Sequence, residues 1–320
     1  MIEIKNLVKY YGENKAVDDV SFTVDAGEVL GFLGPNGAGK STTMNILTGF
    51  ISATSGTVKI NGYDILEEPE KARSHIGYLP EQPPLYKDMT VLEYLRFVAD
   101  LKNVPKKEQM PMLARIMALV KITDVRKRLI DNLSKGYRQR VGIAQALVGD
   151  PEVIVLDEPT VGLDPKQIKD IRSMIRSLGK QHTVILSSHI LSEVAATCDR
   201  VIIIDEGRIV AGGSASNLGN AIDGISRVEV IVSGNNDRAM QILREIDGIN
   251  AVHFLRSEAD STVYQYETDE DVDVREDVFK AFARERMPLI GMRSLNPTLE
   301  DIFLKVTSSS YHMPEGGRRA

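Results

Sequence analysis

The sequence predicts an α/β fold, in which buried parallel strands alternate with helices and end at polar loops. Two stretches indicate this fold. The apolar run Val29–Leu33 continues through the loop 34–41, with the sequence GPNGAGKS, into the helical segment 42–47. The apolar run Val153–Leu156 ends in the paired acids Asp157 and Glu158. A buried parallel strand of this kind presents both carboxylates at the sheet edge where α/β proteins bind ligands.

The loop 34–41 has the pattern GxxxxGK(S/T), which defines a P-loop when a strand precedes it and a helix follows it. Its glycines let the backbone curl so that amide N–H groups point inward, and the helix N-terminus favours a bound phosphate. In this motif Lys40 reaches the β- and γ-phosphates, and the Ser41 hydroxyl ligates Mg²⁺. A glycine-rich turn before a core helix is the simpler alternative, but every defining position of the motif is filled.

Length and composition indicate a globular protein of one large or two ordinary domains, with 320 residues of which 42% are hydrophobic. No run of about 18 apolar residues occurs, and residues 1–5 do not resemble a signal peptide, so we expect a soluble chain made in the cytoplasm. Residues 1–220 contain 27 basic and 27 acidic residues, so the net charge of −6 arises entirely in residues 221–320. This distribution argues against nucleic-acid binding and indicates a boundary near residue 220.

Alternating apolar residues predict strands over residues 2–8 and Ala16–Val24, with Tyr10, Tyr11 and Gly12 in the loop between them. Tyr11 suits stacking on a purine and surface packing equally well. Further strands are predicted over Ser55–Gly62, which ends in a turn, and over Ile76–Pro80.

The segment after Pro80 begins with a proline-rich loop and continues with residues at helical spacing. Residues 81–86 are rich in proline, which forbids regular structure. Residues 90–130 have apolar residues at helical spacing, which predicts an all-helical insert. Ser134 then occupies the N-cap position of a further helix, so the chain has a second helix N-terminus suited to an anion.

The acids at the end of the strand 153–156 suit two distinct roles. Asp157 suits a ligand of Mg²⁺, directly or through water, and Glu158 suits the base that orients an attacking water molecule. Acids at such a strand end can alternatively cap the next helix. After a helix over residues 166–179, the strand Thr183–Ser188 presents His189 at its end. A lone histidine is often structural, but its place at the same sheet edge favours a role in the site.

The last third predicts a small α+β domain after a hairpin over Arg200–Val210. Its strands and helices follow the order βαββαβ, which is that of a split-βαβ, ferredoxin-like domain. The predicted elements are Arg227–Val232, Asp237–Ile246, Ala251–Leu255, Thr262–Glu267, Val274–Arg286 and Leu289–Ser294, followed by a helix over Thr298–Val306. Residues 221–306 therefore form an accessory domain without a recognisable chemical role, and residues 307–320 form a disordered tail.

The order of these motifs resembles the nucleotide-binding subunit of ABC transporters, a family of P-loop NTPases, over residues 1 to about 220. The resemblance implies an ABC ATPase core with an antiparallel β subdomain and a helical subdomain at about residues 90–150. It also implies that Tyr11 stacks on adenine, that Asp164 lies in the D-loop and that His189 senses the γ-phosphate. The Walker A motif comprises Gly34, Pro35, Asn36, Gly37, Ala38, Gly39, Lys40, Ser41 and Thr42.

Two motifs depart from the family pattern. Leu133–Arg140 resembles the LSGGQ signature and keeps Ser134 and Gly136, the two positions expected to donate to phosphate, but replaces the first glycine and the glutamine. The glutamine of the Q-loop aligns with Glu81, and Gln82 follows one place later. Either residue can therefore be the one that approaches Mg²⁺ and the attacking water.

The stretches LSKGYRQRVG, IGYLPE and LEDIFLKVT are similar to ATPases that serve ABC-2-type permeases, including gliding-motility and multidrug-export ATPases. This similarity implies ATP and Mg²⁺ as cofactors and a separate ABC-2-type membrane permease gripped by the helical insert. It further implies a second ATPase subunit, identical or paralogous, whose signature covers the ATP on this chain's P-loop. The expected activity is ATP hydrolysis that drives export from the cytoplasmic face of the membrane.

A soluble ABC ATPase acting on nucleic acid or ribosomes is the alternative function. DNA-repair types separate the two halves of the ATPase by a long coiled coil, whereas Lys40 and Asp157 are only 117 residues apart. Translation-factor types carry two cassettes, and this sequence has one. A small-molecule kinase would have no use for the signature helix. The transporter is therefore favoured.

Overall fold

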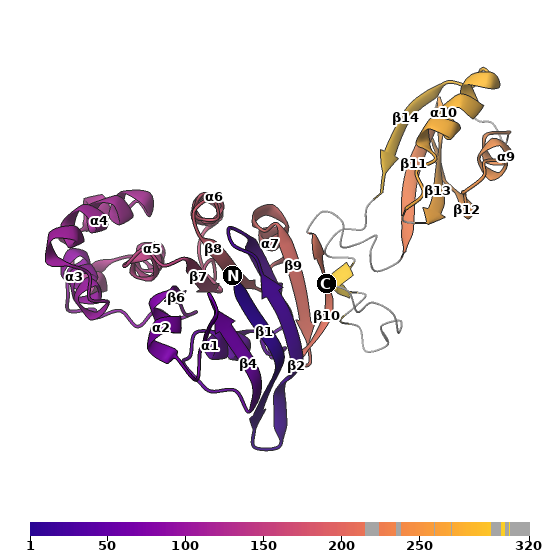
Figure 1. The fold of residues 1–320 in the computed structure, drawn as a ribbon. Helices are drawn as coiled ribbons and strands as arrows, with labels where there is room; N and C mark the ends of the chain where they lie inside the picture. Colours follow the sequence, from indigo (N-terminus) through magenta and orange to yellow (C-terminus); the bar gives the residue numbers. More distant parts are fainter. Residues whose placement is uncertain are drawn as a thin grey trace. The chain divides into compact units, whose positions relative to one another are not determined.

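The computed structural model describes residues 1–214, 224–234, 238–258, 260–269, 271–295, 302–304 and 307 (Figure 1). The described residues fall into two compact units, one that contains residues 1–214 and Thr307 and one that contains the described residues between Gly224 and Leu304. Each unit has its own hydrophobic core.

The first unit is built on a six-stranded sheet with the order β10-β9-β3-β8-β7-β6. Five neighbouring strands are parallel, and β10 pairs antiparallel with β9 at one edge. Every residue of β3, β7 and β8 is buried, which explains the apolar runs Val29–Leu33, Val153–Leu156 and Val184–Leu186 within them. The strands are β3 (Val29–Leu33), β6 (Ile76–Leu79), β7 (Val153–Asp157), β8 (Thr183–Ser188), β9 (Arg200–Asp205) and β10 (Arg208–Ser214).

A four-stranded antiparallel sheet with the order β2-β1-β4-β5 packs its apolar residues into the same core. Its strands are β1 (Ile2–Tyr11), β2 (Asn14–Val24), β4 (Ser55–Ile60) and β5 (Tyr63–Asp64). The loop predicted at residues 10–12 was wrong for the tyrosines, because Tyr10 and Tyr11 belong to β1 and Tyr11 pairs with Asn14. Gly12 has a φ of 60°, so the turn closes over two residues directly after Tyr11.

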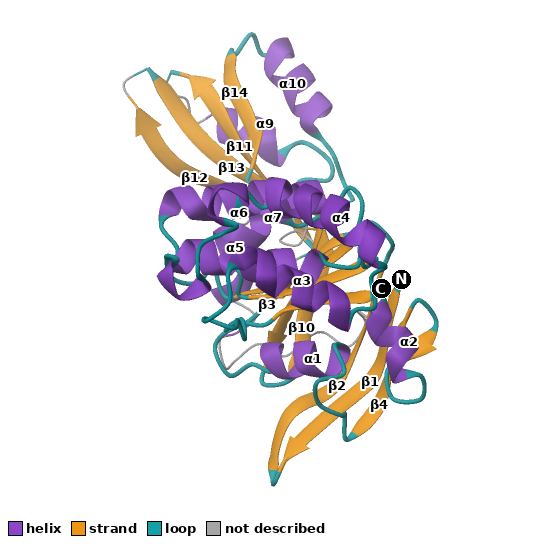
Figure 2. Cartoon of the chain, turned by 90° about the vertical axis from the view of Figure 1, so that its left-hand side faces the viewer, coloured by secondary structure: helices purple, strands orange, loops and turns teal. Residues whose placement is uncertain are grey.

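The helices confirm the predicted helical insert, which lies beside the β6 edge of the central sheet (Figure 1), and Figure 2 shows its helices α3, α4 and α5 from that side. The insert comprises α3 (Val91–Leu101), α4 (Lys106–Leu119) and α5 (Lys135–Leu147), with short 3₁₀ turns at Thr123–Val125 and Ile130–Asn132. The other helices are α1 (Lys40–Leu47), α2 (Pro69–Ser74), α6 (Pro165–Leu178) and α7 (Leu191–Thr197). Over the residues that the structure describes, none of the helices combines the length and the apolar character needed to span a membrane.

The second unit confirms the predicted split-βαβ arrangement. Its antiparallel sheet has the order β12-β13-β11-β14, so β13 lies between the two strands that α9 connects. The elements are β11 (Ile225–Ser233), α9 (Arg238–Arg244), β12 (Ala251–Glu258), β13 (Ser261–Asp269), α10 (Arg275–Arg284) and β14 (Leu289–Ser294). Of the predicted final helix, residues 302–304 are helical, and the rest of it lies outside the described residues, as does all of the tail except Thr307.

Candidate active site

A cleft of about 410 Å³ contains the P-loop and the residues that follow three neighbouring strands. Glu81 comes from the loop after β6, Glu158 and Val161 from the loop after β7, and His189 from the end of β8. Ala16 of β2 completes the wall, and the P-loop contributes Asn36, Gly37, Gly39, Lys40, Ser41 and Thr42. The parallel strands therefore bring residues more than a hundred positions apart to one edge of the sheet.

The P-loop conformation depends on glycine at the start of α1. Gly39 is the N-cap residue, with a φ of 103°, which is strained for any residue with a side chain. A Cβ atom at this position would lie 2.5 Å from the carbonyl oxygen of Ala16, so the loop packs directly against β2. This close approach sets the loop against the strand and places Lys40 in the first turn of the helix.

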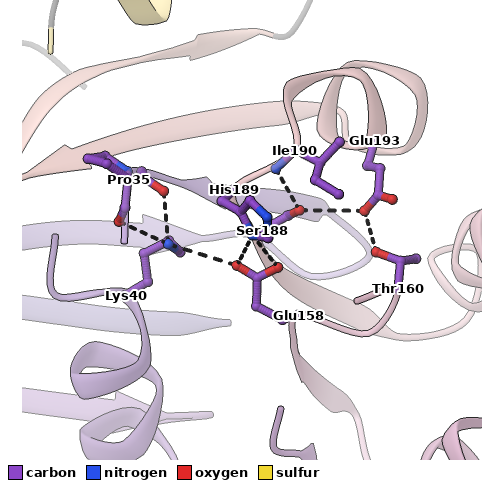
Figure 3. Close-up of polar contacts among 9 residues, drawn as sticks. Pro35, Lys40, Glu158, Thr160, Ser188, His189, Ile190 and Glu193 are labelled. Atoms are coloured by element: carbon purple, nitrogen blue, oxygen red, sulfur yellow. Dashed lines mark hydrogen bonds and ion pairs between the residues drawn. The ribbon is translucent and has the colours of Figure 1, made fainter. Parts of the chain in front are cut away.

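Lys40 is held inside the cleft by the loop itself. Its side chain is 6% exposed, and its Nζ donates to the carbonyl oxygens of Gly34 at 2.8 Å and Pro35 at 3.1 Å (Figure 3). Burial lowers the pKa of Lys40, and the nearby carboxylates, of which Glu158 is the most influential, oppose this effect. The ammonium is thus fixed where a phosphate group in the cleft would meet it.

Glu158 is turned into the cleft by its backbone. Its φ of 48° lies in the left-handed region, which is strained for glutamate, and its N–H donates to the carbonyl oxygen of Ser187 at 3.0 Å. The carboxylate accepts from His189 Nδ1, which lies 2.9 Å from both oxygens (Figure 3). Burial raises the pKa of Glu158, while the hydrogen bond from His189 and the charge of Lys40 lower it.

Asp157 has an unsatisfied oxygen that fits a cation. It is the last residue of β7 and is 2% exposed, and its Oδ1 has no hydrogen-bond partner among the described residues. Buried carboxylate oxygens are normally satisfied, so a missing ligand is the simplest explanation. Mg²⁺ usually takes one or two carboxylates, waters and phosphate oxygens rather than a complete protein cage. The residues fit this ion, because Ser41 lines the P-loop cleft together with Glu158, which directly follows Asp157 in the chain.

The structure separates Glu81 from Gln82. Glu81 lines the P-loop cleft, and its charge acts on Lys40. Gln82 instead lines a second cleft of about 480 Å³, which also contains Phe50, Tyr78 and Val98. Only the first of the two adjacent residues is therefore brought to the P-loop.

The remaining predicted site residues do not line the P-loop cleft of the described chain. Tyr11 is 51% exposed, and the ammonium of Lys9 lies 5.3 Å from its ring centroid. Ser134 caps α5 by accepting from Tyr137 N at 3.4 Å, and Gly136 is buried against Gln167. Asp164 caps α6 by accepting from Gln167 N at 2.9 Å. Two of these residues thus have local capping roles.

Several residues of the cleft and its surroundings were missed by the sequence analysis. Ala16 and Val161 line the cleft but are apolar, so their residue type carries no chemical signal. Thr160 and Ser188 are buried close to Glu158 and His189, and both donate a hydrogen bond to Glu193 of α7. The signal that could have found them is their place in the chain, since Thr160 lies two residues after Glu158 and Ser188 directly precedes His189.

Comparison with known proteins finds ATP-binding proteins of ABC transporters that are similar over most of the chain. Residues 17–161 match the family model for ABC transporters. The chain is 33% identical over 310 residues to the linearmycin resistance ATP-binding protein LnrL of Bacillus subtilis, covering 96% of this chain and 98% of LnrL. It is 41% identical over 212 residues to the bacitracin transport ATP-binding protein BcrA of Bacillus licheniformis, covering 66% of this chain and 68% of BcrA.

A solved structure shares the architecture of the first unit. The dimeric ATP-binding cassette MJ0796, in a post-hydrolysis state bound to ADP and phosphate, is similar with a TM-score of 0.62 and 26% identity. The similarity covers 67% of this chain and 99% of that cassette.

Proposed function

The chain belongs to the ABC transporter family as an ATP-binding, ATP-hydrolysing subunit, and we propose that it drives export through a separate ABC-2-type membrane permease. LnrL is described as a resistance protein and BcrA as a transport protein, which supports a role in moving compounds out of the cell. The proposed ATPase domain comprises residues 1–220, with its helical subdomain at about residues 90–150, and residues 221–306 form the accessory domain.

One observation carries the proposed catalytic roles, namely the joint placement of Lys40, Glu158 and His189 in the P-loop cleft. Lys40 binds the β- and γ-phosphates. Glu158 is the base, and His189 holds its carboxylate and senses the γ-phosphate. Glu81 takes the place of the Q-loop glutamine, because it lines this cleft and Gln82 lines another.

Hydrolysis then follows from the positions of these groups. Glu158 accepts a proton from a water molecule as the water oxygen bonds to the γ-phosphorus. The bond from the γ-phosphorus to the β–γ bridging oxygen breaks, and the electron pair leaves with ADP. Ser41 and Asp157 would hold Mg²⁺, which would neutralise part of the phosphate charge. The strained backbone of Glu158 keeps its carboxylate aimed at the water.

A second subunit completes the proposed site. Ser134 and Gly136 stand at the N-terminus of α5, which suits a phosphate, yet they do not line the P-loop cleft of the described chain. We therefore assign them to the ATP on the partner subunit, with Asp164 in the D-loop between the two sites and Tyr11 against the adenine. The dimeric state of MJ0796 supports this arrangement.

The cleft that contains Gln82 is the proposed contact for the permease. It lies between the loop after β6 and the helical insert, since Val98 of α3 and Gln145 of α5 line it. Phe50, which is 77% exposed, shares this cleft with Tyr78 and Val98, and apolar side chains grouped at an open cleft are typical of a protein contact. Binding here would hold the chain at the cytoplasmic face of the membrane.

Glu158→Gln in the full-length chain tests the proposed function. We expect ATP hydrolysis to fall by about a hundredfold or more, because the amide cannot accept the proton, while ATP binding is retained. Light scattering after gel filtration with ATP should detect a stable dimer of this variant. Hydrolysis at the unmutated rate would exclude Glu158 as the base. Purification in detergent should also recover a membrane permease, and recovery of ribosomes or DNA without one would favour the soluble alternative.

A further inference from the structure

A buried carboxylate behind the active site connects the two loops that carry Glu158 and His189. Glu193 lies on α7 and is 1% exposed. Its Oε2 accepts a hydrogen bond from Thr160 Oγ1 and another from Ser188 Oγ at 3.5 Å (Figure 3). Thr160 follows Glu158 by two residues, and Ser188 directly precedes His189.

We propose that Glu193 is a positioning residue for ATP hydrolysis. It fixes the loop that carries Glu158 and the strand end that carries His189 in their positions relative to each other. The proposal rests on the proposed role of Glu158 as the base. In this arrangement Glu193 touches neither ATP nor water. It acts by keeping the carboxylate of Glu158 and the ring of His189 at their 2.9 Å separation.

The burial of Glu193 is not explained by stability alone. Removing a carboxylate from water is unfavourable unless close partners compensate for it. Its nearest cation, Arg172 Nη2 of α6, is 3.7 Å from Oε1, and Oε1 has no hydrogen-bond partner in the part of the chain that the structure describes. Since an apolar residue of similar volume would avoid this cost, the two hydrogen bonds accepted by Oε2 are the structural reason for an acid here.

The groups that Glu193 holds have little freedom of their own. Thr160 is 3% exposed, and Ser188 is fully buried. Ser188 Oγ also accepts from the backbone N–H of Ile190 at 3.0 Å, so this hydroxyl connects Glu193 to the segment that carries His189. On the other side, Glu158 has a strained backbone, which persists only where the surroundings hold it. Loss of the Glu193 carboxylate would remove the hydrogen bonds from Thr160 and from Ser188 together.

Steady-state hydrolysis by the full-length chain tests the proposal with three variants. Glu193→Ala removes the acceptor, and we expect kcat to fall about ten- to a hundredfold, as small displacements of a reacting group typically do, with KM for ATP within about twofold. Glu193→Gln keeps a carbonyl that can accept, so it should recover most of kcat. Val194→Ala is the matched control, because Val194 is fully buried on the same helix but cannot accept a hydrogen bond. The kcat of Val194→Ala should stay within about twofold of the unmutated value, although its loss of thermal stability should be comparable to that of Glu193→Ala.

A double variant distinguishes positioning from a general effect on folding. In the Glu158→Gln background, adding Glu193→Ala should lower the residual single-turnover rate by less than about twofold, because the group it positions is already disabled. An equal reduction in both backgrounds, or an unchanged kcat for Glu193→Ala, would overturn the proposal. If Glu158→Gln itself hydrolyses ATP normally, the proposed function of Glu158 fails and this proposal fails with it.

Discussion

Lys40 Nζ lies 3.8 Å from Glu158 Oε1, and the two side chains are 6% and 7% exposed. Burial acts on both groups in the direction that disfavours charge, because it lowers the pKa of Lys40 and raises the pKa of Glu158. The pair therefore places a cation for phosphate and an acceptor for a proton side by side, with both side chains largely buried. The charge of Lys40 can be tested by ATP binding, and the raised pKa of Glu158 by the pH dependence of stability.

Lys40→Met should weaken ATP binding by about ten- to a hundredfold, since a hydrogen bond to a charged group contributes about 1.5–3 kcal/mol. Methionine has a similar length but neither the charge nor the donor. Titration of the purified chain with a fluorescent ATP analogue measures the dissociation constant. Lys71→Met is the control, because Lys71 lies on α2, is exposed and pairs with Glu68 at the N-cap of that helix. Equal affinities for the two variants would contradict the assignment of Lys40 to the phosphates.

Glu158→Gln should raise the thermal stability of the nucleotide-free chain at neutral pH. The pKa of Glu158 is raised above its ordinary value of 4.5, so its ionisation in the folded chain is less favourable than in the unfolded chain. As pH rises from 4.5 through the raised value, the unmutated chain loses stability that the glutamine variant retains. Below pH 4.5 the difference should disappear, because the carboxyl is protonated in both states. Melting temperatures measured with a chelator across this range test the sign, and a variant that melts lower at neutral pH would refute it.

The sequence was sufficient for the parts of the site that depend on one continuous segment. Val29–Lys40 and Val153–Glu158 fold as predicted, because apolar runs of this length have to be buried and the polar residues after them have to emerge at a strand end. The order of elements in the second unit was predicted for a similar reason, since its strands and helices alternate in hydrophobic periodicity.

The sequence was insufficient where the outcome depends on contacts between distant segments. Glu81 and Gln82 are neighbours in the chain, yet they line different clefts, and local pattern does not specify which of the two side chains shares a cleft with Lys40. Glu193 is buried because Thr160, Ser188 and Arg172 converge on it from three other elements. The short helices α2 and α7 were missed because six or seven residues are too few to show a helical period.

Glu81→Ala and Gln82→Ala should have different effects on ATP hydrolysis. Loss of Glu81 removes a charged group from the P-loop cleft, so we expect kcat for ATP hydrolysis to fall by about tenfold or more with ATP binding retained. Loss of Gln82 alters the other cleft, so hydrolysis by the isolated chain should stay within about twofold of the unmutated rate. Parallel assays of the two variants measure this contrast. A larger loss of hydrolysis for Gln82→Ala would instead place the Q-loop function at position 82.

Mixed dimers of two inactive variants should regain hydrolysis if each site needs residues from both subunits. Ser134→Asp keeps an N-cap for α5 but places a negative charge against the γ-phosphate of the partner's ATP, whereas Ser134→Asn keeps the cap without the charge and serves as the control. We expect Ser134→Asp and Lys40→Met to be inactive when each is assayed alone.

A dimer that contains one subunit of each variant has one intact site, formed by Lys40 of the Ser134→Asp subunit and Ser134 of the Lys40→Met subunit. Random equimolar mixing places half of the chains in such dimers, so about a quarter of the unmutated rate should return if the sites act independently. The rate is measured after the two variants are mixed and allowed to exchange subunits. A rate no higher than the mean of the two separate variants would mean that each chain carries a complete site.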